Sequence, residues 1–447
     1  MHPAHQGAHF ITQWNTHCIK CHSTGGVPGL IADTNEFETR VGELGIACEA
    51  CHGPGEKHIQ ANQDPLRRFE LYLSGNPDST IVNPSRLDHE ASSQVCGQCH
   101  DVFIERKEYG MRYPFEGILY QPGDDLFKTR YYIQHPNNDP NSVRKQELRE
   151  NPEFFRQRWW EDGTTLAGGR EFTAMSVSEC YKQGEISCLS CHSMHDGPPE
   201  DQLKAGMDSV AACIQCHDQA KYTTDIQSHT YHLPESTGSN CLNCHMPRNS
   251  YALFDAIRSH QIAAPNLAGS VHYGVPNACN LCHLDQTLDW TQDHLADWYG
   301  HEKLPLNEKQ RSTSAAVLWL LSGDAAQRAI SEWHFGWEPA QQTSGANWLA
   351  PLLSRLLADP YGVVRYVAEH SLRKLPGFAD FCYDFLAAEE ELQRQVQFAT
   401  QQWRQNHSPP TAGLGESVCI DETGDVLETK VEQLLLQRNN RPVTIKE

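Results

Sequence analysis

The sequence predicts a mainly α-helical protein with much irregular structure, divided near residue 303. Up to about residue 300, short helical stretches are interrupted by Gly and Pro and by a recurring pentapeptide, Cys-x-x-Cys-His. From about residue 304, apolar residues recur at spacings of three and four, which is the pattern of amphipathic helices. Alternating apolar and polar residues, the pattern of half-buried strands, are few. We therefore expect one domain over 1–303 and a second, helical domain over 304–447.

The pentapeptide occurs seven times and is the attachment sequence of c-type haem. Residues three and four apart face the same side of a helical turn. Two thiols can therefore bond the two vinyl groups of one porphyrin while the His ligates its iron as the proximal ligand. The predicted attachment residues are Cys18, Cys21, His22, Cys48, Cys51, His52, Cys96, Cys99, His100, Cys188, Cys191, His192, Cys213, Cys216, His217, Cys241, Cys244, His245, Cys279, Cys282 and His283. The expected cofactor is haem c, seven per chain and covalently attached.

Structural zinc is the alternative, because paired Cys with nearby His also forms tetrahedral zinc sites. A four-ligand zinc site usually takes two such pairs, whereas seven pairs is an odd number and each pair is followed at once by His. Haem is therefore favoured. The other three cysteines, Cys180, Cys382 and Cys419, are interpreted as small buried side chains.

Composition agrees with a core that is partly cofactor. Hydrophobic residues make up 39% of the chain and the mean hydropathy is -0.59, so the sequence is more polar than a typical globular protein. The net charge is -21, and haem propionates would add to it. Nucleic acid is therefore not an expected partner, and a redox protein steered to a specific site is.

The sequence also bears on location. No run of eighteen apolar residues occurs, so no transmembrane segment is expected. The start lacks the basic region and apolar stretch of a signal peptide. Because haem is attached covalently on the outer side of the bacterial cytoplasmic membrane, we expect a periplasmic or extracellular protein, either preceded by further residues in its natural form or freed of its leader.

Each low-spin haem iron needs a sixth ligand, and His is the commonest supplier. Of 24 His, seventeen remain beyond the proximal ligands. His195 follows His192 by three residues on the same side of a turn, so it would have to ligate the iron of a neighbouring haem. His58 follows Gly53-Pro54-Gly55, a turn that directs it away from its own haem. The predicted distal ligands are His58, His195, His229, His232 and His260. Bis-His coordination of this kind gives mostly low reduction potentials.

Two further segments stand out. The stretch of roughly ninety residues between the third and fourth pentapeptides is rich in Tyr and Trp, and we expect it to pack over cofactors rather than to form a catalytic pocket. The predicted C-terminal helices are Ser314–Leu321, Trp348–Leu357, Val363–Leu375, Phe381–Leu392 and Lys430–Gln437. Within them, Leu356–Arg373 resembles a HEAT repeat, with Asp359-Pro360 at the turn. Such repeats bury their apolar faces by stacking, and a plain helical bundle is the alternative.

Taken as a set, these motifs resemble the bacterial multihaem cytochromes c that have C-terminal HEAT or tetratricopeptide repeats. The segments that carry the resemblance are 15–22, 43–55, 95–100, 187–195, 244–247, 276–283 and 441–445. The resemblance implies electron transfer, with His58, His195, His229 and His232 as distal ligands. Members of this family usually begin with a leader and a further haem segment that this chain lacks, and partners of the first haems could come from there.

Two functions remain open. The first is an electron relay through closely packed haems, with the helical repeat domain docking another protein. The second is a multihaem oxidoreductase of the nitrite, hydroxylamine or sulfur oxyanion type, in which one iron keeps an open position. All seven pentapeptides end in His, so the Cys-x-x-Cys-Lys variant of pentahaem nitrite reductases is absent from the sequence. No nucleophile elbow, phosphate loop or paired-carboxylate signature stands out and no catalytic residue is identified, so the relay is favoured.

Overall fold

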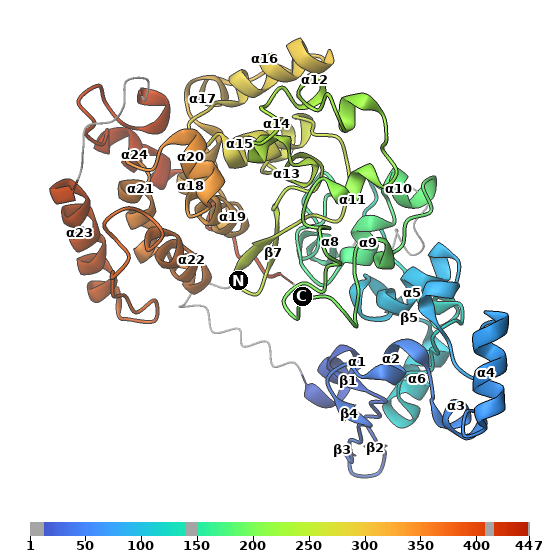
Figure 1. The fold of residues 1–447 in the computed structure, drawn as a ribbon. Helices are drawn as coiled ribbons and strands as arrows, with labels where there is room; N and C mark the ends of the chain where they lie inside the picture. Colours follow the sequence, from blue (N-terminus) through green and yellow to red (C-terminus); the bar gives the residue numbers. More distant parts are fainter. Residues whose placement is uncertain (1–12, 140–150, 407–414, 446–447) are drawn as a thin grey trace. The chain divides into compact units, whose positions relative to one another are not determined.

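The computed structural model describes residues 13–139, 151–406 and 415–445. Of these residues 48% are helical and 8% are in strands, which confirms the predicted mainly α class (Figure 1). The strands of the described part form only two-stranded antiparallel pairs. The chain folds into two compact units. The described part of the N-terminal unit is 13–139 with 169–208, and that of the C-terminal unit is 151–168 with 209–406 and 415–445.

The N-terminal unit consists of short helices and strand pairs. Its helices are η1 (Trp14–Cys18), α1 (Ile19–His22), α2 (Cys48–His52), α3 (Glu56–Ala61), α4 (Pro65–Ser74), η2 (Pro84–Arg86), α5 (His89–His100), α6 (Lys107–Glu116), η3 (Leu126–Lys128), α9 (Glu171–Met175), α10 (Glu179–Lys182) and η4 (Cys188–Ser190). Its strand pairs are β1 (Ser23–Thr24) with β4 (Glu43–Leu44), β2 (Leu30–Ile31) with β3 (Glu36–Phe37), and β5 (Phe103–Glu105) with β6 (Arg130–Tyr132).

Helix α5 lies at the centre of this unit. The Asp88 carboxylate accepts a hydrogen bond from the Ala91 amide and caps its first turn. Gly97 packs directly against Phe172 of α9, because a Cβ at this position would lie 2.8 Å from the Phe172 ring. The close approach of the two helices therefore depends on a glycine inside the third pentapeptide.

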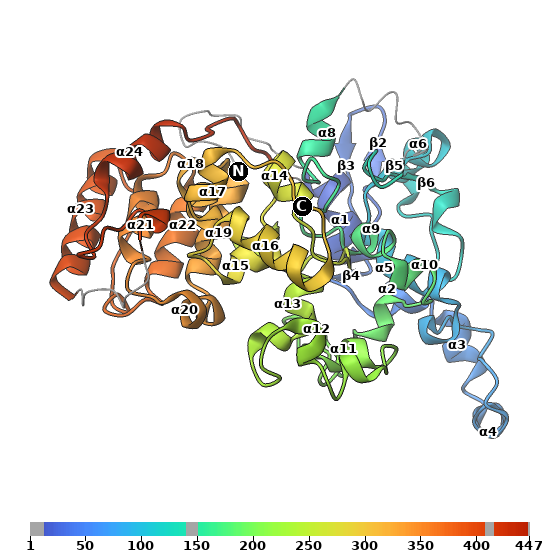
Figure 2. The same cartoon turned by 90° about the horizontal axis from the view of Figure 1, so that it is seen from above.

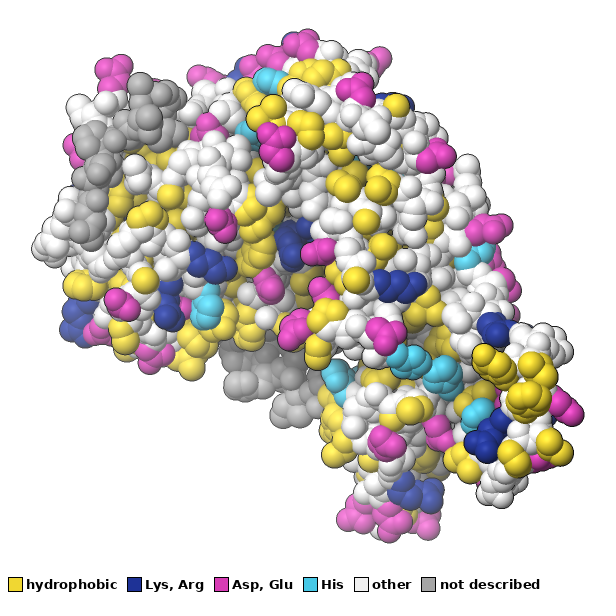
Figure 3. Space-filling model, in the orientation of Figure 1, with side chains coloured by type: hydrophobic (Ala, Val, Ile, Leu, Met, Phe, Trp, Pro, Cys, Tyr) yellow, Lys and Arg dark blue, Asp and Glu magenta, His cyan; other side chains and the backbone are white. Residues whose placement is uncertain are grey.

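Helix α4 has an unusual apolar stripe. Asp64 caps it and Pro65 occupies its first turn, and Gly75, with φ of 66°, ends it. Leu66, Phe69 and Leu73 recur at helical spacing but are 60–70% exposed. Hydrophobic side chains are exposed at the lower right of Figure 3, in the region where Figure 1 shows α4. In this unit the apolar side of α4 therefore faces outward.

The C-terminal unit contains most of the long helices. Its helices are α8 (Pro152–Arg156), α11 (Ala211–Ile214), η5 (Ala220–Tyr222), α12 (Gln227–Thr230), η6 (Thr237–Ser239), α13 (Cys241–His245), α14 (Ala268–Tyr273), α15 (Ala278–Cys282), α16 (Leu288–Tyr299), α17 (Glu308–Ser312), α18 (Ala315–Ser322), α19 (Ala325–Phe335), α20 (Glu338–Ser344), α21 (Ala350–Ser354), η7 (Arg355–Ala358), α22 (Gly362–Leu372), α23 (Glu389–Asn406), η8 (Glu416–Val418) and α24 (Glu428–Leu436). One hairpin joins β7 (Ser250–Ala252) and β8 (Asp255–Ile257).

The later helices of this unit pack in series. Helix α18 contacts α19, α19 contacts α22, α22 contacts α21, and α21 contacts α23 (Figures 1 and 2). Hairpin β7–β8 contacts α19. Among the described residues, no helix is both long and apolar enough to cross a membrane.

A single hydrophobic core extends through this unit. It includes Leu281 inside the seventh pentapeptide, Leu284 directly after it, and Leu320 and Leu353 of the later helices, all at most 2% exposed. All seven pentapeptides precede the predicted boundary near residue 303. The hydrophobic core contains residues from both sides of that boundary. The HEAT-like assignment of 304–447 stays a prediction.

The predicted helix Phe381–Leu392 is wrong over its first two thirds. Residues 381–388 are not helical, and α23 begins only at Glu389. The Tyr383 hydroxyl donates to the Leu357 carbonyl, and the Phe385 carbonyl accepts from Arg365 Nε at 2.7 Å. These tertiary contacts hold an irregular segment, and Cys382 within it is exposed rather than buried. Cys419 is buried as predicted.

Helix α19 carries two buried charged residues, Arg328 and Glu332. Arg328, which is fully buried, forms an ion pair with Asp359 at 3.0 Å, and Arg438 contacts the same carboxylate at 3.1 Å. Glu332, one turn along α19, is also fully buried, and neither of its carboxylate oxygens has a hydrogen-bond partner within the described part of the chain. Burial, with the charge of Asp359, raises the pKa of Glu332 well above its usual value. A protonated Glu332 avoids an unpaired charge in the core.

Replacing Glu332 by Gln should reduce the loss of stability at rising pH. The folded protein holds a proton on Glu332 that the unfolded chain releases above about pH 4.3, so stability falls as pH rises from there toward the raised folded pKa. We expect the urea midpoint of the wild type to fall relative to that of Glu332→Gln as the pH rises above about 4.3, as followed by far-ultraviolet circular dichroism. Parallel pH profiles of the two proteins would contradict this assignment.

Candidate haem-binding sites

Each pentapeptide lies in or next to a helical turn. The second is α2 itself, the third ends α5, the sixth is α13 and the seventh ends just after α15. In the fourth, fifth and seventh, the His amide donates to the carbonyl of the first Cys at 2.7–3.0 Å, which closes the turn. Two thiols and one imidazole therefore lie on one side of each of these turns, as the chemistry of haem attachment needs.

Thiols of different pentapeptides meet within each unit. In the N-terminal unit, a hydrogen bond between Cys21 and Cys99 lowers the pKa of Cys21 to about 7 and raises that of Cys99. Cys96 and Cys188 interact in the same way, with the pKa of Cys188 lowered. In the C-terminal unit, contact with Cys213 lowers the pKa of Cys241 to about 7. The first and third, third and fourth, and fifth and sixth pentapeptides are thus direct neighbours.

Three of the predicted distal histidines lie against a pentapeptide histidine. The ring centroids of His52 and His195 are 5.9 Å apart, with 9° between the ring planes. Those of His229 and His245 are 6.1 Å apart, with 8° between the planes. Those of His232 and His283 are 6.0 Å apart, with 40° between the planes. Rings stacked directly face to face would have centroids much closer than this.

In each of these pairs one ring has its Nδ1 atom engaged by a backbone carbonyl. His52 Nδ1 lies 2.7 Å from the Val82 carbonyl, His245 Nδ1 lies 3.0 Å from that of Ala263, and His232 Nδ1 lies 2.6 Å from that of Thr230. A carbonyl can only accept, so the Nδ1 atoms donate and the lone pair of each ring is on Nε2. This is the tautomer that ligates a metal through Nε2.

Burial keeps several of these rings uncharged. It lowers the pKa of His283 to about 4, with the neighbouring His232 adding to the shift. Burial likewise lowers the pKa of His229 and of His245. A neutral imidazole is the form that ligates iron, so these environments favour the ligating state.

His232 depends on a glycine that sequence inspection did not single out. A Cβ at Gly238 would lie 2.2 Å from Cδ2 of the His232 ring. Only the absence of a side chain at 238 allows the ring to occupy its place. Because a lone Gly has many possible roles, its sequence position gave no signal of this one.

The other predicted distal histidines are held differently. His58, on α3, has its Nδ1 3.2 Å from an Asp78 carboxylate oxygen, and His260 has its Nδ1 3.2 Å from the Arg258 carbonyl.

His100 of the third pentapeptide has its Nδ1 2.6 Å from Glu171, a contact that raises the pKa of His100. Glu171 was not identified from the sequence, because it lies far along the chain in a different helix.

The spacing of the three pairs of His rings can be compared with the spacing that two ligands of one haem iron require. Two rings that ligate one metal from opposite sides, with metal–nitrogen bonds of about 2 Å, have centroids roughly 6 Å apart, against roughly 5 Å in a tetrahedral site. The three observed spacings agree with the first arrangement. The residues present therefore fit haem in the manner of a bis-His c-type site.

Residues 180–222 match the family model of the doubled CXXCH motif. The match includes the fourth and fifth pentapeptides, which are thereby covalent haem c sites of the kind that transfers electrons. The comparisons with curated proteins and with solved structures gave no match. The match extends over a minor part of the chain, and its two pentapeptides belong one to each unit.

Replacing Cys213 and Cys216 together by Ser should remove one haem. The thioether bonds form at these thiols, so the expected result is a loss equal to one haem in the intact mass and in the pyridine haemochrome assay. Cys180→Ser is the matched control, because Cys180 lies in the same matched segment but outside the pentapeptides. An unchanged haem count in the double variant, or an equal loss in Cys180→Ser, would contradict the assignment.

Proposed function

We propose that this chain is a multihaem c-type cytochrome that carries electrons between redox partners through seven covalently attached haems. The observation that supports it most is the set of three histidine pairs spaced at about 6 Å. Each pair joins the His of a pentapeptide to a His from a different segment. When bound, haem supplies one-electron chemistry between its ferric and ferrous states.

The proposed ligand pairs are His52 with His195, His245 with His229, and His283 with His232. His195 belongs to the fourth pentapeptide region but lies against the His of the second. The same pairing would therefore tie two haems to each other within the N-terminal unit. In the C-terminal unit, His229 and His232 come from one short segment and would ligate irons of the sixth and seventh haems, which brings those two haems together as well.

Two ligands on one iron leave no position for substrate. Bis-His coordination therefore favours an electron carrier over an oxidoreductase with an open iron. The contacts between thiols of neighbouring pentapeptides support the same conclusion, because adjacent attachment points bring porphyrin edges close within each unit. Backbone carbonyls on Nδ1 then hold the ligand rings in place and increase their basicity, which favours the ferric state.

The later helices of the C-terminal unit are proposed to be HEAT-like and to dock a redox partner. The succession of α21, η7, the Asp359-Pro360 turn and α22 supports this, since each helix packs on its neighbours. An exported, periplasmic location is proposed because covalent haem attachment takes place outside the cytoplasm. The buried Arg328–Asp359 pair would fix the turn between these helices.

Substituting His195 by Ala should convert one haem from low spin to high spin. Loss of the sixth ligand opens the iron of the second pentapeptide, so we expect a high-spin electron paramagnetic resonance signal of about one haem per chain, with the covalent haem count unchanged. His370→Ala is the control, because His370 lies half exposed on α22, remote in sequence from every pentapeptide. A spectrum identical to that of the wild type would refute the proposed pair, and a high-spin haem already present in the wild type that shifts with nitrite or hydroxylamine would favour the oxidoreductase.

Gly238→Ala should have a related effect at the seventh haem without altering any ligand. The added Cβ would displace the His232 ring, so a high-spin signal of up to one haem is expected. Gly415→Ala is the matched control in the same unit, because a Cβ there meets nothing within 4 Å. Equal spectra for the two alanine variants would argue against His232 as a ligand.

A further inference from the structure

The His of the third pentapeptide is held by a charged group instead of a backbone carbonyl. His100 Nδ1 lies 2.6 Å from a carboxylate oxygen of Glu171. At His52 and His245 the partner of Nδ1 is a backbone carbonyl, at 2.7 and 3.0 Å. A hydrogen bond to an ionised acceptor is shorter and roughly twice as strong as one between neutral groups. The third pentapeptide therefore differs from the second and the sixth in the charge beside its His.

The contact is compatible with an iron on Nε2. An ionised carboxylate can only accept, so the proton of this hydrogen bond is on Nδ1 of His100. That proton stays on Nδ1 when Nε2 bonds a metal, and the contact with Glu171 therefore persists in the haem-loaded protein. The His100 side chain is 53% exposed and that of Glu171 is 24% exposed, so part of the ring is open to a haem. The second Glu171 oxygen accepts from the Gly169 amide at 2.9 Å, which fixes the carboxylate.

Helix α9 fixes the position of Glu171 relative to the third pentapeptide. The next residue, Phe172, packs directly on Gly97 inside the pentapeptide. The residue after it, Thr173, accepts from the Val102 amide through its hydroxyl at 2.8 Å. Three successive residues of α9 thus each contact the third pentapeptide or the chain directly after it. The approach of Glu171 to the ring is part of a packed arrangement of two helices.

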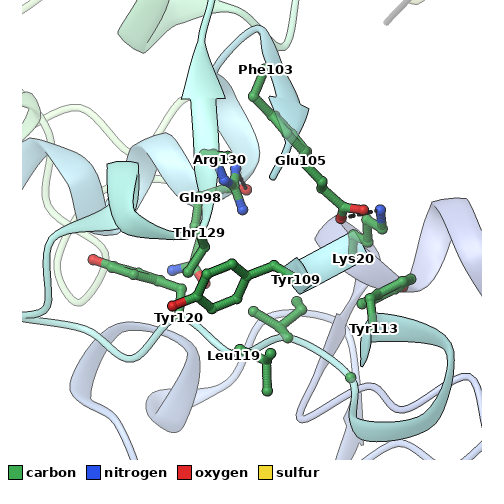
Figure 4. Close-up of a pocket in the computed structure, with 12 residues that line it drawn as sticks. Lys20, Gln98, Phe103, Glu105, Tyr109, Tyr113, Leu119, Tyr120, Thr129 and Arg130 are labelled. Atoms are coloured by element: carbon green, nitrogen blue, oxygen red, sulfur yellow. Dashed lines mark hydrogen bonds and ion pairs between the residues drawn. The ribbon is translucent and has the colours of Figure 1, made fainter. Parts of the chain in front are cut away.

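The end of α5 is also held from strand β6. Arg130 Nη1 donates to the Gln98 carbonyl at 3.0 Å and to the Asp101 carboxylate at 3.1 Å. Arg130 and Gln98 lie side by side in Figure 4. Arg130 is 7% exposed and Asp101 is 2% exposed. Because the backbone is fixed on both sides of His100, the ring is held in its orientation toward the carboxylate.

We propose that Glu171 lowers the reduction potential of the haem attached at the third pentapeptide. The inference rests on the proposed function, in which His100 ligates the iron of that haem. A negative charge beside the Nδ1 proton makes Nε2 a stronger electron donor, and a stronger donor stabilises ferric iron more than ferrous iron. Glu171 acts through His100 and does not touch the iron, so it is a positioning residue.

The place of this haem gives the lowered potential a consequence. Cys99 of the third pentapeptide contacts Cys21 of the first. Its other thiol, Cys96, contacts Cys188 of the fourth. The third haem therefore lies between two others in the N-terminal unit. A lowered potential keeps it oxidised and able to accept, so electrons pass through this haem and rest on its neighbours.

Glu171→Gln tests the charge with little change of shape. The Gln side chain has the same length, and its amide oxygen can still accept from Nδ1. In a spectroelectrochemical titration of the full haem-loaded chain, we expect the midpoint of one haem to shift to a higher potential and the other midpoints to stay. At the wild-type midpoint, the ferrous-to-ferric ratio of that haem should rise several-fold. Glu179→Gln is the matched control, because the Glu179 side chain is 70% exposed on α10 of the same unit.

Haem count and spin state separate a tuning role from a structural one. The pyridine haemochrome assay and the electron paramagnetic resonance spectrum of Glu171→Gln should show the wild-type haem content and no new high-spin signal. Loss of haem or a new high-spin signal would make Glu171 a structural residue and overturn the proposal. An unchanged titration, or an equal shift in Glu179→Gln, would overturn it as well. A wild type without covalent haem would refute the proposed function itself, and this inference with it.

Discussion

A histidine ring ligates a metal through one nitrogen when its proton is on the other, and backbone carbonyls meet that requirement for three rings of this structure. Carbonyls of Val82, Ala263 and Thr230 occupy the Nδ1 atoms of His52, His245 and His232. A backbone carbonyl is a good device for this purpose, since it can only accept and its position is fixed by the fold. The short helices and irregular segments around the pentapeptides therefore act as supports for ring orientation.

The two units meet this requirement with different amounts of apolar packing. In the C-terminal unit a continuous core joins the leucines around the seventh pentapeptide to the later helices. The N-terminal unit has shorter elements, and close glycine contacts such as that of Gly97 with Phe172 replace extensive side-chain packing. Porphyrins would add the apolar surface that a chain with 39% hydrophobic residues does not itself supply.

Helical periodicity predicted the C-terminal helices well where the apolar residues pack on neighbouring helices. Helices α18, α22 and α24 lie within a few residues of their predicted bounds. The prediction failed over 381–388, where the Tyr383 hydroxyl donates to the Leu357 carbonyl and the Phe385 carbonyl accepts from Arg365. Equal spacing along the chain cannot reveal such tertiary hydrogen bonds, which hold the segment in a non-helical conformation.

The sequence by itself predicted where haem would attach, because attachment needs only two thiols and an imidazole on one side of a single turn, and residues three and four apart meet that condition wherever the turn is helical. Only the tertiary structure decided which histidines face one another, such as His195 and His52, and which carbonyl or carboxylate holds each Nδ1. The sixth position of an iron lies across the porphyrin from its own helix, so its neighbours come from distant segments that local spacing does not relate. Glu171 likewise reaches His100 from 71 residues along the chain, whereas Gly238 lies in the same segment as His232 and leaves room for its ring.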